Sequence, residues 1–144
     1  IIDELKDLNV NIKLITDGDV LRALYVSDRK YNVDMYMGIG GGPEGVLTAS
    51  ALDSYECHFQ GRFIFDNEKD IQQANSMGIK DLDKKYELNE IVKGYSIFCA
   101  TGITDSIFIK GITIDQDKYI SETLITHKNT NYKQLVKNVN SINE

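Results

Sequence analysis

A run of glycines followed by a carboxylate is the part of this sequence best suited to chemistry. Residues 40–42 are all glycine, and Pro43 and Glu44 follow directly. Without side chains, the glycine backbone can approach a ligand closely or adopt a positive φ. Pro43 suits the first position of a helix, because its missing N–H would have no partner there. The stretch therefore predicts a loop that leads into a helix N-terminus, where backbone N–H groups and the helix dipole face an anion.

Two roles are open to Glu44, which lies one residue into the predicted helix. The positive end of the helix dipole stabilises an acid at this position, and this is the commoner use. Alternatively, the carboxylate holds a hard divalent cation beside a phosphate, because such cations take oxygen ligands. The loop is not a dinucleotide fingerprint, since Pro43 interrupts the spacing, and no Gly-Lys-Ser/Thr closes it as in a Walker loop. The local pattern leaves both roles open.

A second acidic turn, Asp17-Gly18-Asp19, precedes another predicted helix. Helix capping explains one aspartate well, because an Asp before a helix accepts backbone N–H bonds. It explains two aspartates around a glycine less well. Carboxylates here could also accept hydrogen bonds from sugar hydroxyls or lie near a metal.

Two strand–loop–helix units position these turns. The first combines a strand over 10–15 with a helix from about residue 20 to 26, and the second combines a strand over 33–37 with a helix over 46–52. Successive units of this kind predict parallel strands whose C-terminal ends share one edge, where open α/β sheets bind ligands. The expected fold class is α/β, with a mixed, largely parallel sheet and flanking helices.

The remaining segments extend this pattern. Helices are expected over 1–8 and 68–77, and a short strand with a helical turn over 86–92. Strands are expected over 56–65, 95–105, 107–114 and 119–126, the last two joined by the turn at residues 115–117. We expect residues 1–128 to form the domain and the polar, Asn-rich tail 129–144 to fray. Weaker candidates for ligand contacts, each with a commoner structural use, are His58, Arg62, Thr101, Thr104, Asp105, His127 and Lys128.

Composition excludes several classes of function. The 144 residues are 42% hydrophobic and 26% charged, which suits one globular domain. A net charge of −6 argues against nucleic acid or an anionic membrane as a partner. We find no apolar stretch near the roughly 20 residues of a membrane span. Cys57 and Cys99 each lie in an apolar run and predict reduced core thiols, hence a cytoplasmic protein.

The motifs together resemble the C-terminal half of class II fructose-1,6-bisphosphatases. The chain begins at Ile1 inside a helical pattern, which suggests a piece of a longer protein. The motifs that carry the resemblance, in order, are Leu14-Ile15-Thr16-Asp17-Gly18-Asp19-Val20, Gly38-Ile39-Gly40-Gly41-Gly42-Pro43-Glu44-Gly45, Gln60-Gly61-Arg62, Phe98-Cys99-Ala100-Thr101-Gly102-Ile103-Thr104-Asp105 and Glu122-Thr123-Leu124. The resemblance implies a sugar-phosphatase fold related to inositol monophosphatases. It also implies hydrolysis of the 1-phosphate of fructose 1,6-bisphosphate with Mn²⁺ or Mg²⁺, and in some members of sedoheptulose 1,7-bisphosphate.

The resemblance also assigns roles to residues. It implies that Asp17, Gly18 and Asp19 contact the substrate, that Gly41 contacts it through the backbone, and that Glu44 ligates the metal. It places no catalytic residue within this segment, so we expect the segment alone to be inactive. The complete protein is expected to be a homo-oligomer. The sequence departs from the family's pattern at Gly42, where alanine is usual, at Ser106, where glycine is usual, and in a less basic stretch over 127–133. A non-catalytic α/β module that binds a phosphorylated sugar is the alternative.

Overall fold

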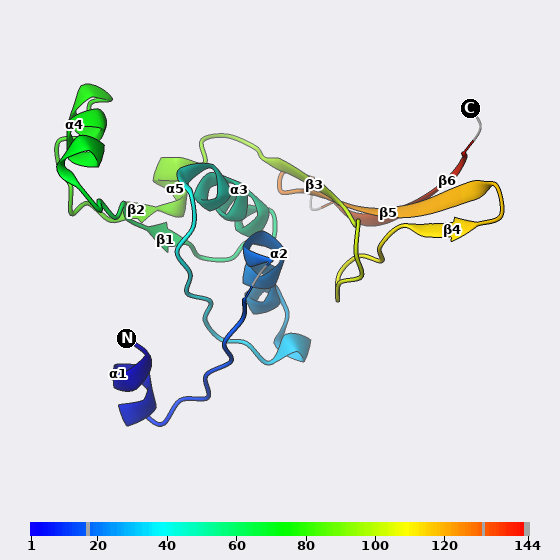
Figure 1. Ribbon diagram of the computed structural model, residues 1–144, viewed down its shortest axis with the longest axis horizontal. Coiled ribbons are helices and arrows are strands. Elements are labelled where there is room, and N and C mark those ends of the chain that lie inside the picture. The colour runs from blue at the N-terminus through cyan, green and yellow to red at the C-terminus, as the bar shows by residue number, and fades with distance from the viewer. Residues whose placement is uncertain (17, 131, 143–144) are drawn as a thin grey trace.

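Helices dominate the first two thirds of the chain, and an antiparallel sheet forms the last third (Figure 1). The computed structural model describes residues 1–16, 18–130 and 132–142. The helices are α1 (Ile2–Asp7), α2 (Asp19–Ala23), α3 (Gly42–Asp53), α4 (Glu68–Ser76) and α5 (Leu88–Ile91), with 3₁₀ turns η1 (Leu24–Ser27) and η2 (Arg29–Tyr31). The strands are β1 (Gln60–Gly61), β2 (Tyr86–Glu87), β3 (Ile97–Thr101), β4 (Thr113–Asp115), β5 (Lys118–His127) and β6 (Tyr132–Ser141).

Local signals placed the helices correctly. The helices predicted over 1–8, 20–26 and 68–77 correspond to α1, α2 with η1, and α4. At the start of α4, the Asn67 side chain accepts a hydrogen bond of 3.1 Å from the Asp70 N–H, and Gly78 follows its end with a φ of 88°. The strand with a helical turn predicted over 86–92 is β2 followed by α5.

The predicted largely parallel sheet is wrong for the part of the chain that the structure describes. Strand β5 pairs antiparallel with β3, β4 and β6, and β1 pairs antiparallel with β2. The segments 10–15 and 33–37, predicted as strands, are not part of either sheet. A parallel strand requires a neighbour brought by a crossover connection, whereas hairpins such as β4–β5 pair locally through a short turn. The strand predicted over 56–65 is reduced to β1, and that over 107–114 to β4.

The tail is a strand rather than a frayed end over residues 132–141. Strand β6 pairs with β5 in continuous register, from Lys118 opposite Ser141 to His127 opposite Tyr132. The prediction failed because most side chains of β6 are exposed, so its sequence shows little apolar pattern. Backbone hydrogen bonds to β5 hold it instead. The division into residues 1–128 and 129–144 stays a prediction.

A small core joins the helices to the sheet. It contains Ala23, Leu24, Ala51, Leu52, Phe98, Ile109 and Leu124. Ala23 and Ala51 are fully buried small residues on α2 and α3, and these two helices pack against each other. Figure 1 shows α4 and the β1–β2 pair on one side of α3 and the four-stranded sheet on the other.

The cysteines only partly match the prediction of two core thiols. Both are free, but Cys57 is half-buried and Cys99 is exposed on β3, because alternate residues of a strand face opposite sides of the sheet. In residues 1–16, 18–130 and 132–142, no helix combines the length and the apolar character needed to cross a membrane.

Candidate functional site

The N-terminus of α3 brings Gly41 and Glu44 into contact. Gly41 is the N-cap residue, with extended backbone, and its carbonyl accepts a hydrogen bond of 3.0 Å from the Gly45 N–H. Glu44 is exposed in the first turn, and its carboxylate lies over Gly41: a Cβ added at Gly41 would collide with Glu44 Oε2. Gly41 therefore leaves the space that the carboxylate occupies.

The turn before α2 is built differently. Gly18 is the N-cap of α2 in the left-handed region, with φ 82° and ψ 38°, which favours glycine. Its carbonyl accepts the Arg22 N–H at 3.0 Å, and a Cβ placed on Gly18 would lie 3.6 Å from Arg22 Nε. Asp17 lies outside the described residues, as does the side chain of Asp19. Arg22, which sequence reasoning missed, therefore places a cation beside this turn, and its spacing of three residues from Asp19 on a helix was the available signal.

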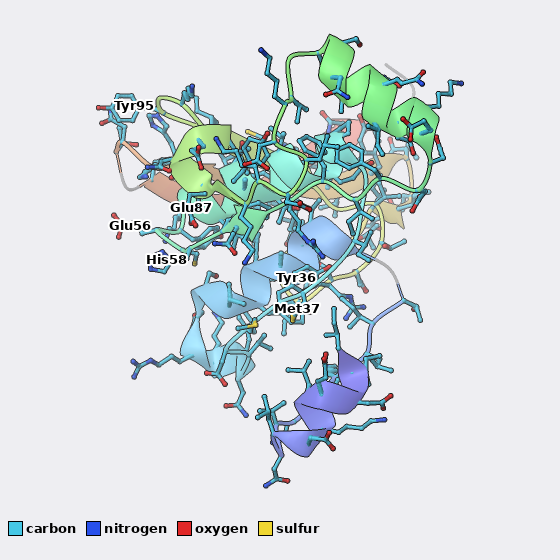
Figure 2. The ribbon with its side chains drawn as sticks, turned by 90° about the vertical axis from the view of Figure 1, so that its left-hand side faces the viewer. Tyr36, Met37, Glu56, His58, Glu87 and Tyr95 are labelled. Carbon is cyan, nitrogen blue, oxygen red and sulfur yellow. The ribbon has the colours of Figure 1, made fainter. Side chains whose placement is uncertain are left out.

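Helices α2 and α3 pack against each other, but the two turns do not meet in either of the cavities described here. A cavity of about 490 Å³ adjoins the C-terminal end of α3 and is lined by Asp53, Glu56, Cys57, His58, Phe59, Glu87, Leu88, Asn89 and Lys128. Figure 2 labels three of these side chains, Glu56, His58 and Glu87. The second, of about 420 Å³, is lined by Val26, Arg29, Asn32, Val33 and Asp34. A shared pocket for the two turns stays a prediction.

Comparison with known proteins decides the family. The profile of the family described as bacterial fructose-1,6-bisphosphatase, glpX-encoded, matches residues 1–142. This chain belongs to that family. The resemblance seen in the sequence motifs is thereby confirmed at the level of the family.

Curated relatives agree with this family. A D-fructose 1,6-bisphosphatase class 2/sedoheptulose 1,7-bisphosphatase of Synechococcus sp. (strain JA-3-3Ab) is 36% identical over 138 residues, covering 87% of this chain and 40% of the relative. The protein of the same name from Prochlorococcus marinus (strain MIT 9515) is 34% identical over 139 residues, covering 87% of this chain and 42% of the relative. The chain thus spans about two fifths of the length of these bisphosphatases.

The side chain of Glu44 has the donor type that suits the divalent cation expected for this bisphosphatase family. Its carboxylate is exposed and offers the oxygen donors that Mg²⁺ and Mn²⁺ prefer. Mg²⁺ is commonly held by one or two carboxylates together with substrate phosphates. Among the residues that the structure describes, no three His, Cys, Asp or Glu side chains gather closely enough to hold a metal. Glu44 therefore fits such a cation in donor type only, as a single carboxylate ligand.

An ion pair between a buried carboxylate and an exposed lysine anchors the opposite end of α3 in this family member. The Asp53 side chain is 4% exposed, and Lys128 Nζ donates to its Oδ1 at 2.6 Å. Ser96 Oγ donates to the other oxygen at 3.3 Å. The sequence suggested that Lys128 contacts an anionic ligand. In the structure, its ammonium group contacts Asp53 instead. Sequence reasoning did not single out Asp53. The available signal was a carboxylate at a helix C-terminus, where the helix dipole disfavours negative charge and a nearby cation must compensate.

Most of the weaker candidates have structural partners. Asp105 Oδ1 accepts the Gly111 N–H at 2.9 Å, and Thr101 Oγ1 lies 2.9 Å from Thr123 Oγ1. His127 Nδ1 lies 3.0 Å from Thr130 Oγ1. These contacts are the turn and cross-strand uses that such residues commonly have. The α3 N-terminus, with Gly41 and Glu44, remains the strongest candidate site.

Proposed function

We propose that this chain is the C-terminal, substrate-side part of a metal-dependent fructose-1,6-bisphosphatase. The complete enzyme hydrolyses the 1-phosphate of fructose 1,6-bisphosphate to give fructose 6-phosphate, as in gluconeogenesis, and also acts on sedoheptulose 1,7-bisphosphate. The family match over residues 1–142 carries the proposal. The contact between Glu44 and Gly41 supports it, because it sets a carboxylate beside backbone N–H groups at a helix N-terminus.

The residues of this chain bind and orient the substrate in this proposal. The first-turn N–H groups of α3, which no side chain caps, favour a phosphate group through the helix dipole. Asp17 and Asp19 accept hydrogen bonds from sugar hydroxyls, and Arg22 limits the repulsion between these acids and the phosphates. Glu44 holds Mn²⁺ or Mg²⁺, which when bound polarises the phosphoryl oxygens and activates water.

The proposal also concerns the complete enzyme, of which this chain is one part. We place the catalytic groups and the other metal carboxylates in the part of the complete polypeptide that this chain does not cover, so the chain alone releases no phosphate. The complete enzyme is a cytoplasmic homo-oligomer, and the two free thiols are consistent with a reducing compartment.

Replacing Glu44 by glutamine in the complete polypeptide tests the metal role. Glutamine keeps the shape of the side chain but loses its charge. We expect phosphate release from fructose 1,6-bisphosphate with Mn²⁺ to fall about 100-fold or more, with an unchanged melting temperature. Glu68→Gln is the matched control, because Glu68 is also exposed in the first turn of a helix, α4. Its activity is expected to match that of the wild type.

The result also separates this proposal from the alternative. Unchanged turnover in Glu44→Gln removes Glu44 from the metal site. A complete wild-type polypeptide that binds fructose 1,6-bisphosphate but releases no phosphate with Mn²⁺ or Mg²⁺ contradicts the enzymatic proposal and supports a non-catalytic binding module.

A further inference from the structure

Three aromatic rings from distant parts of the chain form a cluster just after α2. The ring centroids of Tyr25 and Tyr31 lie 5.3 Å apart, and those of Tyr31 and Phe108 lie 5.0 Å apart. Phe108 also contacts Tyr25, with 5.6 Å between the centroids. All three side chains are half-buried, and rings at these separations attract one another. Phe108 therefore links the loop between β3 and β4 to the turns that follow α2.

The aromatic cluster of Tyr25, Tyr31 and Phe108 lies near one end of a very short helix. Helix α2 has five residues, Gly18 caps its N-terminus, and Tyr25 lies two residues beyond its last residue. A helix of this length is not stable alone, because its few hydrogen bonds do not offset the cost of nucleation. Contacts with the rest of the molecule therefore set the position of α2, and with it the position of the turn at Gly18.

Two sets of contacts hold the C-terminal end of α2. Ala23 and Leu24 are fully buried in the core, which also contains Ala51 and Leu52 of α3. The aromatic cluster is the second set. Figure 1 shows the loop between β3 and β4 extending toward the turns that follow α2. The position of α2 thus depends on this loop as well as on α3.

Ser106 fixes the part of the loop that carries Phe108. Its hydroxyl oxygen accepts the Phe108 N–H at 3.3 Å and the Ile109 N–H at 3.0 Å. The same hydroxyl donates to the Ile109 carbonyl at 3.0 Å. Ile109 is 2% exposed and belongs to the core. Phe108 is therefore presented from a closed turn whose next residue is anchored in the core.

The loop itself is tied to the sheet. The Gly102 N–H donates to the Glu122 carbonyl at 3.0 Å, and the Lys110 N–H donates to Glu122 Oε2, also at 3.0 Å. A Cβ added at Gly102 or Gly111 would collide with backbone atoms across the loop. The loop is therefore compact and attached to β5, which suits it to hold an aromatic ring in one place.

We propose that Phe108 is a positioning residue for substrate binding. It acts through Tyr25 and α2 on the turn before α2, which the proposed function places against the sugar of the bisphosphate, and the inference rests on that function. Phe108 itself contacts neither substrate nor metal. Without its ring, α2 shifts and weakens interactions that are equally strong in the ground state and in the transition state. KM then rises while kcat stays the same.

Steady-state kinetics of the complete polypeptide test this role. Phe108→Ala is expected to raise KM for fructose 1,6-bisphosphate about tenfold and to change kcat less than about twofold. Phe108→Tyr keeps the ring and is expected to keep the KM of the wild type. Phe63→Ala is the matched control, because Phe63 belongs to a different ring cluster, with Phe65 and Tyr86. Its KM is expected to be unchanged.

Ser106→Ala tests the same route with all three rings in place. It removes the hydroxyl that holds the Phe108 backbone and is expected to raise KM about threefold. The double variant Ser106→Ala/Phe108→Ala should raise KM no more than Phe108→Ala alone, because both changes act through one ring. Effects that multiply would contradict this route. If Phe108→Ala does not fold, an unchanged KM in Ser106→Ala overturns the proposal and a raised KM supports it.

Amide hydrogen exchange gives a readout that needs no catalysis. Peptides that cover α2 in the complete polypeptide are expected to exchange about tenfold faster in Phe108→Ala than in the wild type, relative to peptides of α4, and Phe63→Ala should leave α2 unchanged. Equal exchange of α2 in Phe108→Ala and the wild type overturns the proposal. An unchanged KM, or a lower kcat with an unchanged KM, also overturns it. A wild-type polypeptide that releases no phosphate contradicts the proposed function instead, and exchange then decides whether Phe108 positions α2.

Discussion

Replacement of Gly41 by alanine should separate the position of the Glu44 carboxylate from the stability of α3. The Gly41 backbone, at φ −66° and ψ 158°, suits alanine as well as glycine, so no backbone strain arises. The added Cβ would collide with the end of a flexible side chain, Glu44 Oε2, and would lie at an ordinary contact distance of 3.6 Å from Pro43 Cδ. We therefore expect the free energy of unfolding to change by less than about 0.5 kcal/mol while the carboxylate moves away.

The displacement should appear in the metal dependence of catalysis. Loss of a partner that orients a metal ligand typically weakens metal binding about 10- to 100-fold. We expect the Mn²⁺ concentration for half-maximal phosphate release by the complete polypeptide to rise about tenfold, which corresponds to about 1.4 kcal/mol. Initial rates with fructose 1,6-bisphosphate over a series of Mn²⁺ concentrations measure this directly.

Gly42→Ala is the control for this experiment. A Cβ at Gly42 would have no atom within 4 Å, and the residue is helical. Its Mn²⁺ dependence should match the wild type, with a gain in stability of up to about 1 kcal/mol from the lower entropy of the unfolded chain. If Gly41→Ala and Gly42→Ala show the same Mn²⁺ dependence, the contact between Glu44 and Gly41 plays no part in metal binding.

Two further predictions concern the C-terminal end of α3 and the thiol that follows it. Lys128→Met removes the cation from the buried Asp53 carboxylate and should cost about 1–3 kcal/mol in urea unfolding, whereas Lys69→Met on the exposed surface of α4 should cost less than about 0.5 kcal/mol. Equal losses would contradict the anchoring role of the ion pair. Burial raises the pKa of the Cys57 thiol, so iodoacetamide should label it more slowly than the exposed Cys99 and only at higher pH, with the difference lost on unfolding. The stability linked to this thiol is present below the pKa of the thiol in the unfolded chain, and it decreases as pH rises through the pKa of the thiol in the folded chain. Labelling of Cys57 faster than that of Cys99 in the folded chain would contradict the raised pKa.

Elements that depend on neighbouring residues were predictable from the sequence. The Asn67 cap and Gly78 bounded α4 correctly, and the turn around Gln116 joined β4 to β5 as predicted. Glu44 lies in the first helical turn beside Pro43, as the loop pattern indicated. The family motifs were readable because they are short runs of adjacent residues.

Pairings between distant segments were decided by the tertiary structure. Strand β6 forms because β5 offers a complete backbone partner, although its own side chains bury little. The buried Asp53 carboxylate pairs with the ammonium group of Lys128, which lies far along the chain, and no local pattern links them.

The sequence by itself determined where the helices begin, which loop precedes Glu44 and to which family the chain belongs, because caps, turns and motifs act over a few residues. Only the tertiary structure decided that the sheet is antiparallel and that Glu44 lies over Gly41. Strand pairing and side-chain contact depend on which surfaces meet in space, and the residues of one segment do not specify their partner.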